Sequence, residues 1–293
     1  MDINSSTLAK FNIGISAAFA GGLGKAPSQY KKIAMTIPST TAQNTYPWLG
    51  TLPSLREWIG DRVIRNLAAH DYSIKNKKFE STVAVNRDDL EDDQVGIYGP
   101  MFDGLGKEAG VHPDRLIFGL LKKGHQERCF DGQYFFDTDH PVGKTSVANS
   151  FGDDSAPAWY LMCTKAPVMP LIFQTRRAYN LVRLDKDTDE NVFMRGEYLY
   201  GVDARVNAGF GLWQCAIRCT SELTGDTYAQ ARAMMAEFKD DNGDPLGLVP
   251  DMLVVPGTLE SAALGVLSMQ LVKGGESNRW YNTAELLVSP WLA

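Results

Sequence analysis

The segment from His70 to Asp93 joins a basic run, an alternating run and an acidic cluster in one stretch of chain. Three of the four residues from Lys75 to Lys78 are cationic. Val83 and Val85 then alternate with small neighbours, which predicts a half-buried strand. The acidic cluster follows at once and consists of Asp88, Asp89, Glu91, Asp92 and Asp93. Charges grouped by sign in adjacent blocks favour recognition between copies of one chain, because complementary patches fix register.

The preceding region, residues 51–80, supplies the other half of this candidate subunit interface. Apolar side chains such as Trp58 and Ile64 alternate with charged ones, which predicts a two-stranded excursion that turns near residues 66–71. Isolated two-stranded ribbons are only marginally stable, so we expect this one to lie on a neighbouring copy. Aromatic and arginine side chains are the usual anchors of such contacts. The candidate interface therefore comprises Arg56, Trp58, Arg62, Arg65, Tyr72, Lys75, Lys77, Lys78 and the five acids.

Length and charge limit the classes of protein that fit. The 293 residues suffice for one large domain or two ordinary ones, and 44% hydrophobic with 22% charged residues is typical of a globular chain. A net charge of −6 argues against a protein whose main role is to neutralise nucleic-acid phosphates. Residues 1–50 carry four lysines and one acid, hence +3, which indicates an arm with its own contact surface.

The cysteines and the hydropathy pattern indicate a non-secreted, cytosolic protein. Four cysteines show no CxxC pair or metal-ligand spacing, so we expect buried, reduced thiols. The N-terminus has no charged segment followed by an apolar one, and no run reaches the roughly 18 apolar residues that span a bilayer. We expect no membrane association.

The first half of the chain predicts helices and an extended arm. Residues 5–20 have apolar side chains at helical spacing, and Gly21 and Gly22 are expected to end that helix. Residues 25–46 lack periodicity and are expected to form an extended arm outside the core. A second helix is predicted from about residue 93, with a break at Gly110 and Pro113 and a continuation to Lys123.

The second half predicts alternating strands and helices. Short strands are expected at 159–163, 170–174, 191–195 and 209–217, after an Asp131-Gly132 turn. Helices are expected at 227–239 and 259–273, with an Asn242-Gly243 turn between them, and strands at 252–255 and 284–288. Together these elements predict a mixed α+β fold.

One cluster could carry chemistry: Asp131, Asp137, Asp139 and His140 combine carboxylates with a histidine. Such groups hold a divalent metal or act as an acid and base pair, so the alternative function is a soluble metal-dependent hydrolase using Asp137, Asp139 and His140. The structural interpretation is stronger, because these acids alternate with aromatics in a turn-rich stretch and have no second histidine at helical spacing. Neither a phosphate loop, a nucleophile elbow nor a zinc-protease motif occurs, which favours a non-enzyme without cofactor.

The chain resembles the Mu-like prophage major head subunit family, the capsid proteins of tailed phages. The first half carries this resemblance in APSQYKKIAM (26–35), NTYPWLG (44–50), REWIGDR (56–62), HDYSIKNKKFE (70–80), RDDLEDDQVGIYGP (87–100) and PDRLIFGLLKKG (113–124). The second half carries it in CFDGQYFFDTDHPV (129–142), WYL and PLIFQTRR within 159–177, YGVDARVNAGFGLWQ (200–214) and LVVPGTLESAA (253–263). None of these segments is a catalytic motif, so the resemblance implies a structural role.

The resemblance implies a Hong Kong 97-type capsid fold with an N-terminal arm, an extended hairpin loop, a spine helix, and peripheral and axial domains. Residues 1–45 would be the arm, and residues 46–128 the extended loop (about 50–80) and the spine helix of the peripheral domain. Residues 129–273 would be mainly the axial domain, and 274–293 a strand that returns to the peripheral domain. The implied function is a shell of hexamers and pentamers around double-stranded DNA. The implied partners are a separate scaffolding protein, a portal and cementing proteins.

Overall fold

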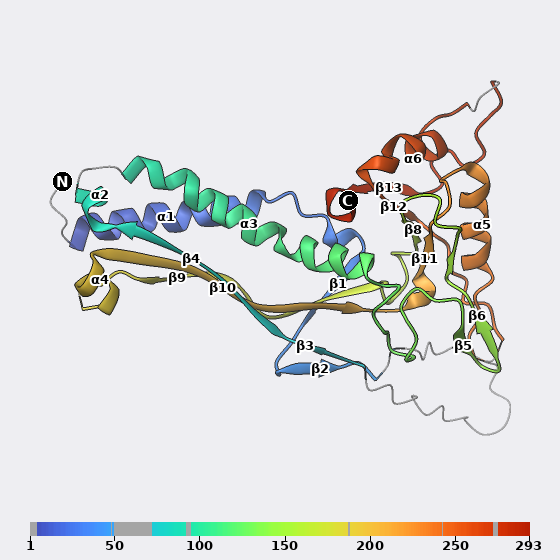
Figure 1. Ribbon diagram of the computed structural model, residues 1–293, viewed down its shortest axis with the longest axis horizontal. Helices are drawn as coiled ribbons and strands as arrows, with labels where there is room; N and C mark the ends of the chain where they lie inside the picture. Colours follow the sequence, from blue (N-terminus) through green and yellow to red (C-terminus); the bar gives the residue numbers. More distant parts are fainter. Residues whose placement is uncertain are drawn as a thin grey trace.

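The computed structural model describes residues 5–47, 49, 72–91, 95–186, 188–241, 243–271 and 275–293. Figure 1 shows two regions, which we call the long layer and the body. The long layer consists of two helices on a four-stranded sheet, and the body surrounds a five-stranded sheet. Among the described helices, none combines the length and the apolarity needed to cross a bilayer.

Two helices, α1 (Ser5–Lys25) and α3 (Val95–Lys122), lie side by side along the long layer (Figure 1). Their backbones meet at glycines: a Cβ on Gly22 would lie 2.0 Å from the carbonyl oxygen of Asp103, and one on Gly106 would lie 2.1 Å from that of Phe19. The prediction that Gly21 and Gly22 end the first helix is therefore wrong. Gly22 continues the helix and is needed where α3 crosses it.

The predicted break at Gly110 and Pro113 is also wrong, because α3 runs through both residues. A proline inside a helix removes a hydrogen bond and costs about 3 kcal/mol. Tertiary contacts offset that cost here: Ile117, Phe118 and Leu121 in the next turns are fully buried. The neighbouring Asp114 carboxylate, also buried, accepts hydrogen bonds from the Tyr30 and Gln29 amides at 2.7 and 3.0 Å.

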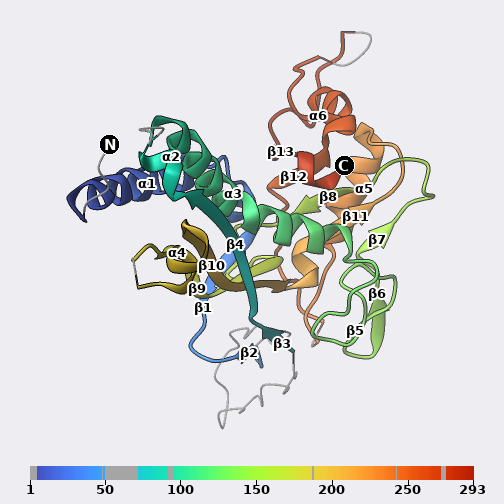
Figure 2. The ribbon, with the colours of Figure 1, turned by 60° about the vertical axis from the view of Figure 1, so that its left-hand side comes forward.

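The sheet of the long layer has the strand order β1 (Ala34–Pro38), β9 (Leu171–Leu184), β10 (Glu197–Phe210), β4 (Lys77–Asn86). β1 is parallel to β9, and the other pairs are antiparallel. α1 and α3 cover one face (Figure 2). The predicted strand containing Val83 and Val85 is confirmed as β4. The expectation that residues 25–46 lie outside the core is wrong, because Tyr30, Ile33, Ala34 and Tyr46 are buried.

The root of the predicted excursion is a small antiparallel pair, β2 (Gln43–Thr45) with β3 (Ser73–Lys75). This pair brings residues 45 and 73 together, so the two ends of the predicted excursion lie at one place. Residues 50–71, with Arg56, Trp58, Arg62 and Arg65, lie outside the described residues.

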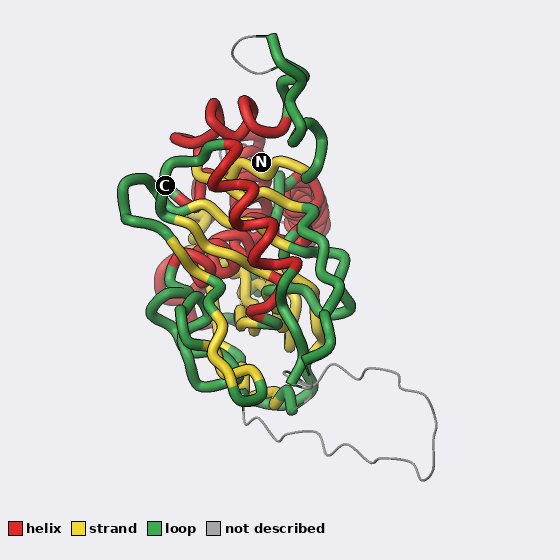
Figure 3. Tube along the Cα trace, turned by 90° about the vertical axis from the view of Figure 1, so that its right-hand side faces the viewer, coloured by secondary structure: helices red, strands yellow, loops and turns green. Residues whose placement is uncertain are grey.

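The body contains a second sheet of mixed direction. Its strand order is β13 (Glu285–Ser289), β12 (Met252–Pro256), β8 (Trp159–Met162), β11 (Ala216–Cys219), β7 (Ser150–Phe151). α5 (Gly225–Ala236) lies in front of these strands in Figure 3, and α6 (Glu260–Leu267) packs on β12 and β13. Shorter elements are β5 (His140–Val142), β6 (Thr145–Val147) and the 3-10 turns η1 (Tyr30–Lys32), η2 (Trp213–Cys215), η3 (Gly257–Leu259) and η4 (Pro290–Leu292). The four cysteines are free and buried, as predicted.

Several expectations for the second half need correction. Residues 191–195 form a helix, α4 (Glu190–Arg195), which Gly196 ends with φ +64°. The strand expected at 209–217 is interrupted by η2, so Cys215 and Cys219 do not share one strand. The helix expected to reach residue 273 ends at Leu267.

Two allocations to layers also differ from expectation. The final strand does not return to the sheet beneath the long helix, because β13 pairs in parallel with β12 and buries Leu287 there. The residues after it reach α3, where the guanidinium of Arg115 lies 5.1 Å from the centre of the Trp291 ring. β9 and β10 fall inside residues 129–273 but belong to the long layer.

Candidate subunit interface

The basic end of the candidate interface is the start of β4. Lys75, Lys77 and Lys78 are all exposed. Strand register places Arg205 of β10 beside both Lys78 and Arg177 of β9, so the basic surface extends across three strands. Arg177 is paired with Asp203 at 2.5 Å. Neither arginine could be predicted here from the sequence, because only the pairing of strands far apart in the chain brings them to the lysines.

The acidic end is the short helix α2 (Arg87–Glu91) that follows β4. Asp88 is exposed, and its backbone amide donates to Asn86 Oδ1 at 3.0 Å. Asp89 is half-buried and accepts a 2.5 Å hydrogen bond from the Tyr98 hydroxyl. Burial and this bond to Asp89 raise the pKa of Tyr98 to about 12. Asp89 is thus engaged within its own chain, whereas the Glu91 side chain, Asp92 and Asp93 lie outside the described residues.

Tyr72 does not have the position expected of an interface anchor. Its side chain packs against the chain's own core, and its hydroxyl accepts a hydrogen bond from the Phe210 amide at 2.7 Å. Burial raises the pKa of Tyr72, so the hydroxyl stays protonated. Tyr72 therefore supports the root of the excursion from inside the subunit, and its assignment to the interface stays a prediction.

A buried polar network, which the sequence did not signal, fixes the same root. The Gln174 side chain accepts from the Tyr46 hydroxyl at 2.7 Å and donates to Asn76 Oδ1 at 2.8 Å. Asn76 in turn donates to Ser39 Oγ at 2.8 Å and to the Thr41 carbonyl at 2.9 Å. Since buried polar groups are costly unless paired, this network specifies where the excursion departs.

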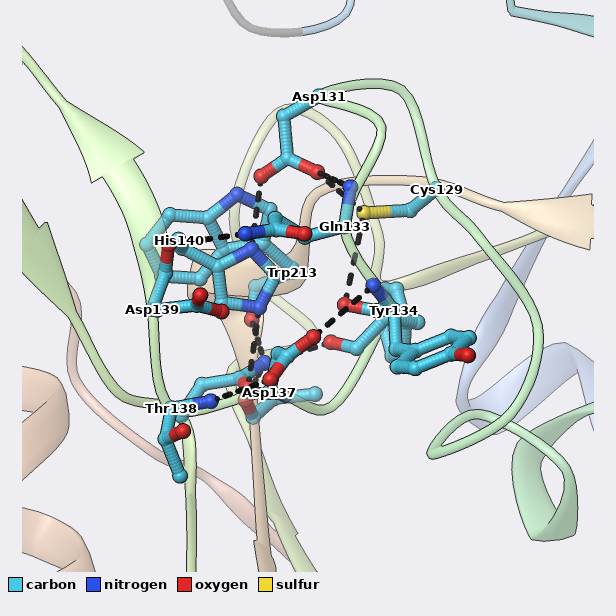
Figure 4. Close-up of polar contacts among 12 residues, drawn as sticks. Cys129, Asp131, Gln133, Tyr134, Asp137, Thr138, Asp139, His140 and Trp213 are labelled. Carbon is cyan, nitrogen blue, oxygen red and sulfur yellow. Dashed lines mark hydrogen bonds and ion pairs between the residues drawn. The ribbon is translucent and has the colours of Figure 1, made fainter.

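The hydrolase candidates do not form one site. His140 is fully buried and stacks on Trp213 with ring centres 4.0 Å apart (Figure 4). Asp137 instead accepts hydrogen bonds from the amides of Thr138 at 2.8 Å and Tyr134 at 3.2 Å. Asp139 is exposed. These carboxylates therefore serve the local turns, and the hydrolase alternative is not supported.

His140 is grouped instead with Cys129 and Asp131, and their potential ligand atoms lie within 4.8 Å of one another. Asp131 forms a hydrogen bond with each of the other two residues: Oδ2 lies 2.7 Å from His140 Nδ1, and Oδ1 accepts from Cys129 Sγ at 3.1 Å. Burial opposes ionisation of Asp131, but these hydrogen bonds outweigh it and hold the pKa of Asp131 below its ordinary value. Burial raises the pKa of Cys129, so its thiol stays protonated and donates to Asp131. The group is a hydrogen-bonded support of the 129–140 turns.

Comparison with known proteins decides the family. The profile of the family described as Mu-like prophage major head subunit gpT matches residues 8–292. The chain belongs to the Mu-like prophage major head subunit family. Its relatives in this family include the major capsid protein of Escherichia phage Mu, 45% identical over 94% of each chain. A second is the Mu-like prophage FluMu major head subunit of Haemophilus influenzae, 43% identical over 88% of each chain.

Solved structures of phage shells match this head subunit over its whole length. A chain of the procapsid of bacteriophage JBD30 is 44% identical and superposes with a TM-score of 0.87, covering 99% of this chain and 100% of that one. A chain of the bacteriophage JBD30 capsid is 35% identical with a TM-score of 0.82 and full coverage of both. The expected Hong Kong 97-type capsid fold is confirmed, and with it the function of a tailed-phage major capsid protein.

Proposed function

We propose that copies of this head subunit assemble as hexamers and pentamers into an icosahedral shell that encloses double-stranded phage DNA. The observation that carries the proposal is the end-to-end match to the JBD30 procapsid chain at 44% identity. A subunit that matches a shell protein over its whole length has the same elements available for contacts between copies. Assembly takes place in the cytoplasm of the bacterial host, and the product is the capsid of the virion.

The two regions have different roles in this proposal. The long layer is the peripheral domain, with α3 as the spine helix, and the body is the axial domain that meets its copies at the centre of each hexamer or pentamer. The position of β9 and β10 supports a peripheral place for residues 171–210, although they lie within the range 129–273 expected to be mainly axial. Residues 1–45 form an arm whose α1 and β1 pack within the long layer, about 50–80 form the extended loop, and 274–293 close the body.

The proposed partners are a separate scaffolding protein during assembly, a portal, and cementing proteins on the finished shell. One solved relative, a JBD30 capsid chain 36% identical with a TM-score of 0.80 over 93% of each chain, comes from a capsid decorated with minor capsid protein trimers. That relative supports a cementing partner for this shell. The DNA is held by non-specific proximity, in keeping with a net charge of −6.

Within the shell, the basic surface of Lys75, Lys77 and Lys78 meets acids of a neighbouring subunit. Their exposure supports this contact, because none of the three is buried against its own chain. Replacement of both Lys77 and Lys78 by Glu should place like charges in the contact and lower the shell yield by roughly tenfold. A tenfold loss corresponds to a contact weakened by about 1.4 kcal/mol. The matched control is Lys122→Glu with Lys123→Glu, another adjacent exposed pair at the end of α3.

Electron microscopy of the purified protein tests the proposal. We expect closed shells, tubes or rings from the wild type and from the Lys122/Lys123 control, and mostly free subunits from the Lys77/Lys78 variant. Monodisperse small particles from the wild type, with or without the scaffolding protein, would contradict the proposed assembly. Normal shells from the Lys77/Lys78 variant would agree with the proposed assembly but contradict a contact through these lysines.

A further inference from the structure

β4 is an edge strand with one long free side. β10 pairs along all ten residues from Lys77 to Asn86, and no other strand among the described residues pairs with the opposite edge. Ten residues at about 3.3 Å each give an edge of roughly 33 Å. An edge of this length carries unpaired amides and carbonyls that can accept a strand from another chain.

The free edge is not protected evenly. Charged side chains block edge pairing in many proteins, and here they stand in the first half, at Lys77, Lys78 and Glu80. The second half, Ser81 to Asn86, carries no charge and is rich in small and β-branched residues. Charge returns just beyond the strand, first at Arg87 and then at the exposed Asp88 and the half-buried Asp89. The edge thus has a basic start, a neutral centre and a mixed, mainly acidic end.

An apolar groove of about 250 Å³ opens beside the same edge, between β4 and α3. Phe79, His112 and Tyr179 form part of its wall, with His112 Nδ1 at 2.6 Å from the Tyr179 hydroxyl and its ring 4.4 Å from Phe79. Burial and then the charge of Arg115 lower the pKa of His112, so this wall is uncharged at neutral pH.

The groove exists because the helices do not cover the edge strand fully. Strand register places Ser81 opposite Val202, on the same face as Phe79, yet Ser81 is exposed. α3 contacts β9 and β10 and leaves this part of β4 uncovered. A strand added at the edge would cover the groove.

We propose that two copies of this head subunit pair β4 with β4, antiparallel, across a two-fold axis perpendicular to the sheet. The inference rests on the proposed function and specifies one of its contacts. Antiparallel self-pairing sets the start of each strand beside the end of the other, so Lys78 approaches the partner's Asp88, although Lys77 then comes opposite the partner's Arg87. Parallel pairing would set like charges together, which costs stability.

The alternation of side chains fixes the register of this pair. Residues that face α3 in one copy must lie opposite residues that face α3 in the other, and a slip by one position would turn one set to the wrong face. Two registers satisfy this with nine residues of each β4 overlapping, centred on Ser81 or on Thr82, and the one that covers the exposed Ser81 with a valine places Thr82 opposite its own copy. Phe79 then lies opposite the partner's Val85, and Ser81 lies opposite the partner's Val83, where it closes the groove.

The symmetry of the pair also suits a closed shell. A two-fold axis perpendicular to the sheet keeps the α1 and α3 layers of both copies on the same side of the joined sheet. A shell requires this, because every subunit must present the same face to the interior. The opposite arrangement, with the axis in the plane of the sheet, would put one copy inside out.

Disulfide trapping in assembled particles tests the register. Thr82→Cys should give a subunit dimer on non-reducing gels after oxidation of the shells, since facing residues of antiparallel strands lie about 4.5–5.5 Å apart. The matched control Ala84→Cys also lies on the outward face, but its two copies are offset by four residues, roughly 13 Å, which is beyond disulfide reach. The double variant Glu80→Cys with Ala84→Cys places facing thiols together and should dimerise. The four native cysteines are buried and give little background.

The outcomes separate this contact from the assembly itself. If Thr82→Cys does not cross-link in assembled shells, or if Ala84→Cys alone cross-links equally well, the β4 pair is contradicted. Neither result contradicts the proposed assembly of the shell. Failure of the wild type to assemble counts against the proposed function instead.

A second pair of variants serves if the cysteine variant does not assemble. Thr82→Lys and Thr82→Glu should each lower shell yield at least tenfold, because like charges then meet at the axis, and co-expression of the two should restore it. Normal yield from both single variants overturns the pairing.

Discussion

The body and the long layer bury their sheets to different degrees. Every residue of β8 and β12 is buried in the body. In the long layer, β9 is buried from Leu171 to Gln174 and then alternates or lies exposed as far as Leu184. Apolar side chains at the far end remain open, with Phe193 83% and Met194 69% exposed.

The difference indicates two kinds of stability within one chain. The body shares one core with the near end of the long layer, with helices against its sheet and large side chains such as Trp159 and Trp213 almost fully buried. The long layer leaves a free edge, a groove and exposed apolar side chains, features that mark interaction sites on soluble proteins. We therefore expect core changes in the body to act on folding, and changes at the far end of the long layer to act on assembly.

The largest effect should come from the core of the body. Trp213→Ala removes a side chain that is 1% exposed, stacks on His140 and packs edge-on to Phe238. Loss of a buried aromatic of this size costs about 3–5 kcal/mol in the free energy of unfolding. Denaturant titration of the unassembled subunit measures it. A loss below 1 kcal/mol would contradict the view that the body depends on its own core.

The next effect concerns the helix pair of the long layer. Gly106→Ala places a methyl group against the Phe19 carbonyl, so α1 must move away from α3 at a cost of roughly 1–3 kcal/mol. Gly104→Ala is the matched control on the same helix, because no atom lies within 4 Å of its Cβ position. The control should gain about 0.5–1 kcal/mol from helix propensity. Thermal melts that change in the same direction for both variants would show that the close approach is unimportant.

The sequence predicted elements whose periodicity is strong and local. β4 follows from the alternation of Val83 and Val85, and β12 follows from an apolar run between turn signals. Local rules failed where distant segments decide the outcome. Gly22 has the local features of a helix stop, but α1 continues through it because α3 packs against it. Pro113 has the local features of a helix break, but the packing of α3 offsets its cost. α4 is too short to show helical periodicity.

The candidate interface was predictable only in part, for the same reason. The charge blocks at Lys75 to Lys78 and at Asp88 can be read from the sequence, and the structure leaves these residues exposed. The engagement of Asp89 by Tyr98 and of Tyr72 by Phe210 could not be predicted, because each bond joins segments that only the fold brings together. The free edge of β4 likewise becomes visible only once the strand order is known.

A smaller effect should appear in acid. The pKa of Asp131 lies below its ordinary value of 3.8, so its contribution to stability is complete above that value and is lost as the pH falls through the lower, folded-state pKa. Asp131→Asn should cost about 1 kcal/mol at neutral pH and flatten the acid limb of unfolding free energy against pH. Parallel acid limbs for wild type and variant would show that the carboxylate does not support the 129–140 turns.

The smallest effect on the subunit should come from the exposed end of the long layer. Phe193→Ser changes a side chain that is 83% exposed on α4, so the free energy of unfolding should stay within about 0.5 kcal/mol. If this apolar side chain finds its partner in a neighbouring copy, shell yield in the electron microscope should nevertheless fall. Glu190→Ser, another exposed position on the same helix, controls for disturbance of α4. Unchanged yield from Phe193→Ser, or a loss of stability comparable to that of Trp213→Ala, would contradict the distinction between side chains that the subunit buries itself and side chains that its neighbours cover.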